Sequence, residues 1–154
     1  MDIPKWLLVG MTTGLLFAPN AIAKCASGKP TLFSCSTAKG KTIEVCDAGK
    51  MITYTFGSPQ AKPEISLNVP RNKVTTFQWN GIGRYLSYAV DIPNDTANSK
   101  TTYSVFHGMD RITKEHAVEA GVNVLVDGKL LATVRCSGKN IINNLEGVDL
   151  APTP

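Results

Sequence analysis

Short stretches rich in Val, Ile, Thr, Tyr and Phe recur along the chain, and apolar positions alternate with polar ones in many of them. Because successive side chains of an extended strand point to opposite faces, this pattern predicts β-strands rather than helices. The predicted strands are Thr31–Ser36, Lys41–Cys46, Met51–Phe56, Glu64–Val69, Lys73–Trp79, Arg84–Ile92, Thr101–His107, Ala117–Val126 and Leu130–Cys136.

Residues typical of turns separate these stretches. Asp127-Gly128 lies between two apolar runs, which is the strongest short signal of a hairpin with a type I′ turn. Lys39-Gly40 predicts a second hairpin. Many short strands at even spacing indicate an all-β fold, so we expect a single antiparallel β-sandwich or small β-barrel of about eight to nine short strands.

The first 23 residues have the features of a secretory signal peptide. Lys5 supplies a positive charge, residues 6–17 are mostly apolar, and residues 21–23 read Ala-Ile-Ala, an A-x-A cleavage signature. An N-terminal membrane anchor is the alternative, but no stop-transfer pattern follows the apolar run. The mature protein is therefore expected to begin at Lys24, to be periplasmic or secreted, and to have no membrane attachment after cleavage.

Beyond the signal peptide, residues 1–23, the chain is long enough for one domain with a single core. The predicted strands place an antiparallel β domain at residues 24–136. Residues 137–154 mix polar with scattered apolar side chains and end in Ala-Pro-Thr-Pro. This C-terminal tail is expected to be partly disordered, or docked on the domain through Ile141, Ile142 and Leu145.

All four cysteines, Cys25, Cys35, Cys46 and Cys136, remain after cleavage of the signal. An even number in an exported chain predicts two structural disulfides, and no Cys-x-x-Cys spacing suggests a metal or redox site. Three pairings are open. Strand alternation can place both Cys35 and Cys136 on apolar faces. This favours Cys35–Cys136 and leaves Cys25–Cys46, although the hairpin that carries Cys136 is apolar on both faces.

Composition and motifs argue against several functions. The formal charge of +4 is mild and spread along the chain, whereas nucleic-acid binding usually needs a clustered basic face. His107 and His116 have no cysteine or paired carboxylate at metal-ligand spacing beside them, so no metal and no cofactor are expected. Nucleophile-elbow and phosphate-loop contexts are missing, and acidic residues occur singly. We therefore expect a protein that is not an enzyme, although two acids distant in sequence can still meet in a fold.

The segment WNGIGRYLSY, residues 79–88, combines strand-forming residues with two closely spaced glycines. Glycine inside a strand marks a bulge, a bend or a close approach of another backbone. Gly81 and Gly83 can also take positive φ values and turn backbone groups outward. Arg84 offers a planar fork for a carboxylate, Tyr85 is a stiff anchor, and Asn80 both donates and accepts hydrogen bonds. The alternatives are a bulged strand and a loop that enters a narrow acidic cleft.

The segments NGIGRY, residues 80–85, and FSCSTAKGKTIEVC, residues 33–46, resemble the bacterial periplasmic inhibitors of c-type and i-type lysozymes. Those inhibitors are small antiparallel β domains that push a loop of the kind S-G-S-G-A-K-Y into the lysozyme cleft. Asn80 stands here where the family has serine, Ile82 is bulkier, and the loop is one residue shorter. The resemblance covers the general layout from about Cys25 to Cys136.

The resemblance implies inhibition by occlusion rather than by chemistry. Arg84 would pair with the ionised catalytic carboxylate of a lysozyme, Asn80 would bond the neighbouring acid, and Tyr85 would pack in a sugar subsite. A chain of charge +4 is repelled by strongly basic c-type enzymes, so an i-type or other less basic lysozyme is the expected partner. The alternative is a non-enzymatic periplasmic β module that binds an envelope protein, the cell wall or a small ligand. Edge strands also allow a homodimer.

Overall fold

The computed structural model describes residues 25–26 and 28–154, and the predicted signal peptide lies outside these described residues. The strands form two sheets. The first sheet has the order β10-β1-β2-β3-β4, with β1 Thr31–Ser36, β2 Thr42–Asp47, β3 Met51–Gly57, β4 Ile65–Pro70 and β10 Ile142–Asn143. The second has the order β11-β5-β6-β7-β8-β9, with β5 Thr75–Gln78, β6 Tyr85–Pro93, β7 Thr101–Asp110, β8 Val118–Val126, β9 Lys129–Arg135 and β11 Ala151–Pro152.

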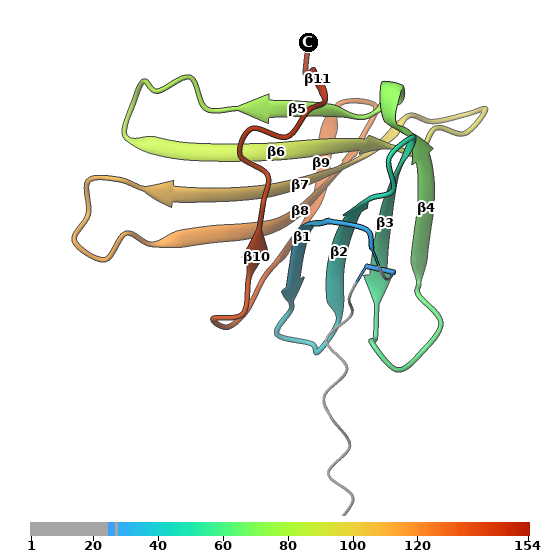
Figure 1. The fold of residues 1–154 in the computed structure, drawn as a ribbon, viewed down its shortest axis with the longest axis horizontal. Coiled ribbons are helices and arrows are strands. Elements are labelled where there is room, and N and C mark those ends of the chain that lie inside the picture. Colours follow the sequence, from blue (N-terminus) through green and yellow to red (C-terminus); the bar gives the residue numbers. More distant parts are fainter. Residues whose placement is uncertain (1–24, 27) are drawn as a thin grey trace, which may run out of the picture.

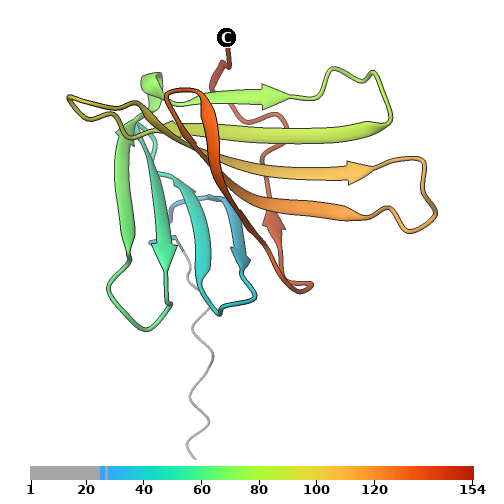
Figure 2. The ribbon, with the colours of Figure 1, turned by 180° about the vertical axis from the view of Figure 1, so that it is seen from behind.

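The two sheets pack as a sandwich whose strands run crosswise (Figure 1). Seen from behind, β9 leaves the second sheet and descends beside the first (Figure 2). An isolated bridge between Thr37 and Cys136 joins the two sheets there. The predicted all-β fold is confirmed, and it is a sandwich with every predicted strand present. A single turn of 3-10 helix, η1 Arg71–Lys73, precedes β5.

The core fills the space between the sheets. Because successive side chains of a strand alternate between its two faces, every second side chain points into this core. The largest fully buried side chains are Phe33, Ile43, Val45, Ile52, Tyr54, Val74, Val90, Ile92, Val105, Val122 and Leu145. Tyr54 of the first sheet stacks on Tyr103 of the second with ring centroids 5.1 Å apart, so the aromatic pair joins the two layers.

The C-terminal tail lies against both sheets. Its strand β10 pairs with β1, and its strand β11 pairs in parallel with β5. Between these strands, Leu145 is fully buried in the core. The sequence did not indicate β10 and β11, because each is only two residues long and two residues cannot show an alternating pattern.

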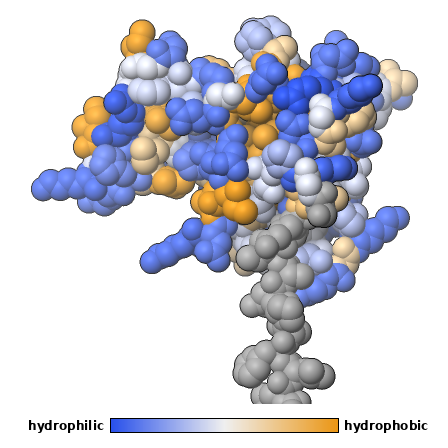
Figure 3. Space-filling view, viewed as in Figure 1, coloured by the Kyte–Doolittle hydropathy of each residue, from blue (hydrophilic) through white to orange (hydrophobic). Residues whose placement is uncertain are grey.

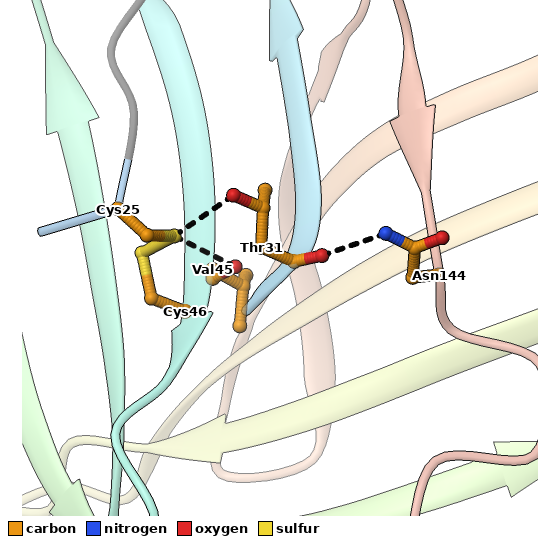
Figure 4. Close-up of a disulfide and its surroundings, with 5 residues drawn as sticks. All are labelled: Cys25, Thr31, Val45, Cys46 and Asn144. Carbon is orange, nitrogen blue, oxygen red and sulfur yellow. Dashed lines mark hydrogen bonds between the residues drawn. A yellow bond between two sulfur atoms is a disulfide. The ribbon is translucent and has the colours of Figure 1, made fainter. Parts of the chain in front are cut away.

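Two disulfides are present, as predicted, and they join Cys35 to Cys136 and Cys25 to Cys46. The first connects the sheets across the core face, since Cys35 stands opposite Ile43 in the register of β1 and β2. The second lies on the outer face of the first sheet (Figure 4). There the Thr31 hydroxyl donates to Cys25 Sγ at 3.2 Å, and Asn144 Nδ2 donates to the Thr31 carbonyl at 2.8 Å.

The turn geometry and the disulfides agree with the predictions made from the sequence. Asp127 and Gly128 both have positive φ, 49° and 77°, as a type I′ hairpin turn requires. The disulfides are consistent with a protein that is exported from the cytoplasm, where thiols are kept reduced. Within the described part of the chain, no helix has the length and apolar character needed to cross a membrane.

Candidate binding site at the hairpin tips

The segment WNGIGRYLSY holds a hairpin connection rather than a bulge within one strand. β5 and β6 run antiparallel with Gln78 opposite Tyr88, so the chain reverses between them. Residues 79–84 lie outside both strands, past the end of β5 and beside the start of β6 at the left of Figure 1. The strand predicted to begin at Arg84 begins instead at Tyr85, because the positive φ of Gly83 interrupts the extended backbone.

Gly81 and Gly83 determine the shape of this tip. Their φ angles are 85° and 98°, which strain any residue that carries a side chain. A Cβ added at either position would meet no heavy atom within 4 Å. Glycine is therefore required by the backbone conformation and not by lack of space, and the tip is left narrow.

Polar contacts inside the tip hold it in one conformation. Asn80 Oδ1 accepts a hydrogen bond from the Ile82 N–H at 3.1 Å, and Trp79 Nε1 donates to the Ile82 carbonyl at 2.9 Å. Both backbone groups of Ile82 are thus bonded within the loop, while its side chain is 77% exposed. The apex is an apolar side chain carried on an ordered backbone.

A second loop, residues 111–117 between β7 and β8, projects beside the first (Figures 1 and 2). The Arg111 guanidinium lies 4.5 Å from the centroid of the Trp79 ring, a cation–π contact. The Arg111 backbone N–H donates to the Arg84 carbonyl at 3.0 Å. We call residues 79–84 and 111–117 the paired tips, since these contacts join them.

Apolar side chains reach the surface at the paired tips. Ile112 of the second loop is 70% exposed, close to the exposure of Ile82 in the first. In Figure 3, hydrophobic atoms appear among hydrophilic ones at the left, the side on which Figure 1 places both loops. Single exposed apolar residues are common on protein surfaces, and here two of them lie on loops that contact each other.

Arg84 is engaged within the protein. Its Nε donates to both carboxylate oxygens of Asp110 at 3.0 and 2.8 Å, and its Nη2 donates to Oδ2 at 2.5 Å. Asp110 also accepts the backbone N–H of Ile112 at 3.0 Å, so the carboxylate links the loops. The Arg84 side chain remains 58% exposed and its Nη1 stands outside the pair.

The pair fixes the charges of both partners. Hydrogen bonds from Arg84 and from the Ile112 backbone hold the pKa of Asp110 well below its usual range. The same carboxylate raises the pKa of the Arg84 guanidinium. Asp110 and Arg84 are therefore both ionised at neutral pH.

Tyr85 lies along the sheet rather than in the tip. It is the first residue of β6, stands opposite Asp110, and is 43% exposed. A Cβ added to Gly108 would lie 2.5 Å from Tyr85 Cε1, so the ring covers a glycine that leaves room for it. β7 continues to Asp110, beyond the predicted end at His107, because Gly108 to Asp110 pair with Tyr85 to Ser87 of β6. Burial and the nearby Glu119 carboxylate raise the pKa of Tyr85.

The structure thus separates the predicted residues into two groups. Asn80, Gly81, Gly83 and Arg84 share one tip, and Tyr85 lies beside it on the outer face of the second sheet. The sequence predicts a loop with one helical turn at most over residues 110–120, but sequence reasoning did not include Asp110, Arg111 and Ile112 in the candidate site. The usable signal was the charged pair Asp110-Arg111 shortly after a predicted strand, but the pairing of β6 with β7 is needed to place it next to Arg84.

One group of metal-ligand side chains comes together among residues 25–26 and 28–154, and it consists of Cys25, Glu44 and Cys46. Both sulfurs are consumed in a disulfide, whereas metal binding by cysteine requires the thiolate. In this oxidised form the group does not provide a metal site.

Comparison with protein-family models, with curated proteins and with solved structures finds no match to this chain. Its function is therefore inferred from the geometry of the paired tips and from the loop resemblance.

Proposed function

We propose that this protein is an exported, periplasmic inhibitor that inserts its 80–85 loop into the active-site cleft of a lysozyme. The observation that carries this proposal is the narrow, internally bonded tip with Ile82 exposed at its apex. A cleft that accepts a sugar chain also admits a narrow loop. A loop that is already ordered loses little conformational entropy on binding, which favours affinity.

The charges of the paired tips suit such a cleft. The paired tips, together with Asp110 at the end of β7, carry one net positive charge, since three cations (Arg84, Arg111 and Lys114) and two anions (Asp110 and Glu115) sum to +1. A lysozyme cleft holds one protonated acid and one ionised carboxylate. Arg84 can keep its bond to Asp110 and still offer Nη1 to the ionised carboxylate. Asn80 has its Nδ2 outside the bond to Ile82, and this group would donate to the neighbouring acid.

The net charge of the protein restricts which classes of lysozyme it would bind quickly. A formal charge of +4 slows association with a strongly basic enzyme. An i-type or other less basic lysozyme therefore remains the preferred target.

A turbidity assay tests the proposal. Purified protein is added to c-type, g-type and i-type lysozymes that act on cell-wall suspensions, at low and at moderate salt. We expect near-stoichiometric inhibition of one class. Arg84→Ala should lose most of that inhibition, because the variant removes the guanidinium and leaves Asp110 to repel the enzyme's carboxylate. Tyr85→Ala should also lose inhibition if the ring packs in a sugar subsite.

Lys41→Ala is the matched control. Lys41 also forms an ion pair, with Glu64 at 2.7 Å, but it lies just before β2 of the first sheet, away from the tips. The control should inhibit like wild type. If Arg84→Ala and Tyr85→Ala both inhibit as strongly as Lys41→Ala, the loop is not the inhibitory element.

One observation favours a second function, a module that binds the cell wall or a small ligand. Tyr85 and Phe77 are 43% and 50% exposed on the same outer face of the second sheet, since Phe77 stands opposite Ala89 and Tyr85 precedes Ala89 by four residues. Exposed aromatic faces suit sugar rings. This function is indicated if no lysozyme class is inhibited but insoluble cell wall retains the protein, and Phe77→Ala releases it.

A further inference from the structure

The first sheet buries a carboxyl group on its outer face. Glu44 stands within β2 and is only 7% exposed. Its neighbours Ile43 and Val45 point into the core, so strand alternation directs Glu44 to the opposite face. Among the described residues, no donor lies within hydrogen-bond distance of Glu44 Oε1, which is itself buried.

The sulfur atoms nearest to this carboxyl group do not supply a donor. The Sγ atoms of Cys25 and Cys46 lie with a Glu44 carboxylate oxygen within 4.8 Å of one another. Because the two sulfurs form a disulfide, neither carries a hydrogen to donate. Burial raises the pKa of Glu44, and an unpaired buried acid is costly to the fold. A buried polar atom without a partner needs an explanation, such as a bound water, an ion or a ligand.

Glu44 lines a cavity that could hold this ligand. The cavity has a volume of ≈ 220 Å³, and its other walls include Thr42, Thr55, Phe56, Pro59 and Pro63. A water molecule occupies about 30 Å³ in the liquid, so the cavity has room for a group of several heavy atoms. Thr42 and Pro59 also line an adjoining hollow of ≈ 500 Å³, whose walls include Ser34, Gln60 and Asn140.

We propose that this cavity binds a primary ammonium group carried on a small polar molecule, with Glu44 as its counter-ion. An ammonium group has three N–H donors. The Glu44 carboxylate and the hydroxyls of Thr42 and Thr55 offer three acceptors in one cavity. A calcium ion fits less well, because it takes six to eight oxygen ligands and the cavity has a single carboxylate.

The adjoining hollow indicates what carries the amine. Its walls carry the hydroxyl and amide groups of Ser34, Gln60 and Asn140. They also carry the ammonium group of Lys139, a donor that suits the hydroxyl oxygens of an amino sugar rather than a second cation. A lysine side chain offers the same ammonium group without those hydroxyls. The site lies on the first sheet and uses neither of the paired tips, so it does not depend on the proposed inhibition.

Binding of glucosamine to the purified protein, followed by isothermal calorimetry and by NMR, tests the proposal. Glucose is the probe without an amine, and Nα-acetyl-lysine amide separates the two sources of the ammonium group. We expect glucosamine to bind and glucose not to bind. Glu44→Gln keeps the shape of the side chain and removes its charge, and it should weaken glucosamine binding at least about tenfold.

Glu115→Gln is the matched control, because Glu115 is exposed in the loop 111–117 and away from the cavity. The Glu115→Gln variant should bind glucosamine like wild type. If Glu44→Gln does not fold, Thr55→Val serves in its place and should also weaken binding. Binding of the lysine amide alone would support the ammonium site and assign it to a peptide source. The proposal is overturned if neither amine binds, if glucose binds as well as glucosamine, or if the Glu44 and Thr55 variants bind like wild type. Lysozyme inhibition by Glu44→Gln should equal that of wild type, which keeps this test separate from the proposed function.

Discussion

Two arginine–aspartate pairs in this molecule have similar chemistry and different surroundings. Arg71 Nη1 donates to both carboxylate oxygens of Asp47 at 2.7 and 2.8 Å, while its Nε and Nη2 donate to the Asp149 carbonyl at 3.1 and 2.6 Å. Arg84 donates to Asp110 through Nε and Nη2 only. The Arg71 side chain is 27% exposed, and that of Arg84 is 58% exposed.

The difference separates a structural contact from a recognition surface. Arg71 has every guanidinium nitrogen in use, and it ties β2 to η1 and to the C-terminal tail. Arg84 joins two loops that project into solvent and keeps Nη1 outside the pair. We therefore expect changes around Arg71 to affect stability, and changes around Arg84 to affect binding.

Removal of the disulfides should have the largest effect, and it should lower the free energy of unfolding. Cys35 and Cys46 lie in the first sheet, which Arg71 also stabilises through Asp47. Loss of Cys35–Cys136, whose cysteines have a sequence separation of 101, should lower the free energy of unfolding by about 4.7 kcal/mol in the chain-entropy model. Loss of Cys25–Cys46, with a separation of 21, should cost about 3.3 kcal/mol by the same model. Urea unfolding of the two Cys→Ser double variants measures this order, and the reverse order would contradict it.

An acidic residue at the apex of the 79–84 loop should have the next largest effect, and it should weaken lysozyme inhibition. Ile82→Asp replaces an exposed apolar side chain, so the fold should be unchanged. In a cleft that already holds a carboxylate, the added charge should weaken lysozyme inhibition about a hundredfold, or about 2.7 kcal/mol. Inhibition constants from the turbidity assay give the measurement. Ile112→Asp tests whether the second loop enters the same cleft, and an unchanged constant for Ile82→Asp would exclude the apex from the contact.

Truncation of Arg71 should have a smaller effect, and on stability alone. Arg71→Ala leaves Asp47 and the Asp149 carbonyl without their charged donor, and we expect a loss of about 2 kcal/mol in unfolding free energy. Below its melting temperature the variant should inhibit lysozyme like wild type. Arg84→Ala should show the opposite behaviour, with an unfolding midpoint close to wild type and weakened inhibition. Equal losses of stability in Arg71→Ala and Arg84→Ala would contradict the assignment of a structural role to Arg71 alone.

The contribution of Asp110 ionisation to the pH dependence of stability should be the smallest of these effects. Hydrogen bonds from Arg84 and the Ile112 backbone depress the pKa of Asp110 in the folded state, below the ordinary value of about 3.9. A depressed pKa adds stability above about pH 4, and this stability is lost as the pH falls through the folded pKa. NMR titration of the Asp110 carboxyl carbon should show the depression, and Arg84→Ala should move the midpoint back toward about 3.9.

Asp47 provides the internal control for this titration. Burial raises its pKa, but hydrogen bonds from Arg71 and Gly49, together with the charge of Arg71, outweigh burial and lower the pKa overall. Arg84→Ala should leave the Asp47 midpoint in place. A wild-type Asp110 midpoint near 3.9 would show that the pair with Arg84 does not persist in solution.

The sequence predicted the sandwich well because its strands alternate clearly and are separated by turn residues. Strand Thr31–Ser36 was predicted at its observed bounds, and Asp127-Gly128 formed the expected turn. Strand ends were less accurate where tertiary contacts decide them. β7 extends to Asp110 because its last residues pair with the start of β6, and no local pattern around His107 shows this.

The candidate site could be predicted only in part. Gly81 and Gly83 indicated an unusual backbone, and both have positive φ. The partners of Arg84 and Trp79 could not be read from the sequence, because Asp110 and Arg111 lie some 26 and 32 positions farther along the chain and reach the tip only through the β6–β7 register. Glu44 was one isolated acid among several, and its burial depends on the loops that cover the outer face.

The most direct test of the account is NMR chemical-shift mapping of the ¹⁵N-labelled protein with each class of lysozyme. Insertion of the 80–85 loop predicts that one class produces the largest shifts at Asn80 to Tyr85, with smaller shifts in residues 111–117. The signals of Glu44 and Arg71 should stay in place. A lysozyme that binds while leaving residues 80–85 unchanged would contradict loop insertion, and the absence of shifts with every class would contradict the inhibitor function itself.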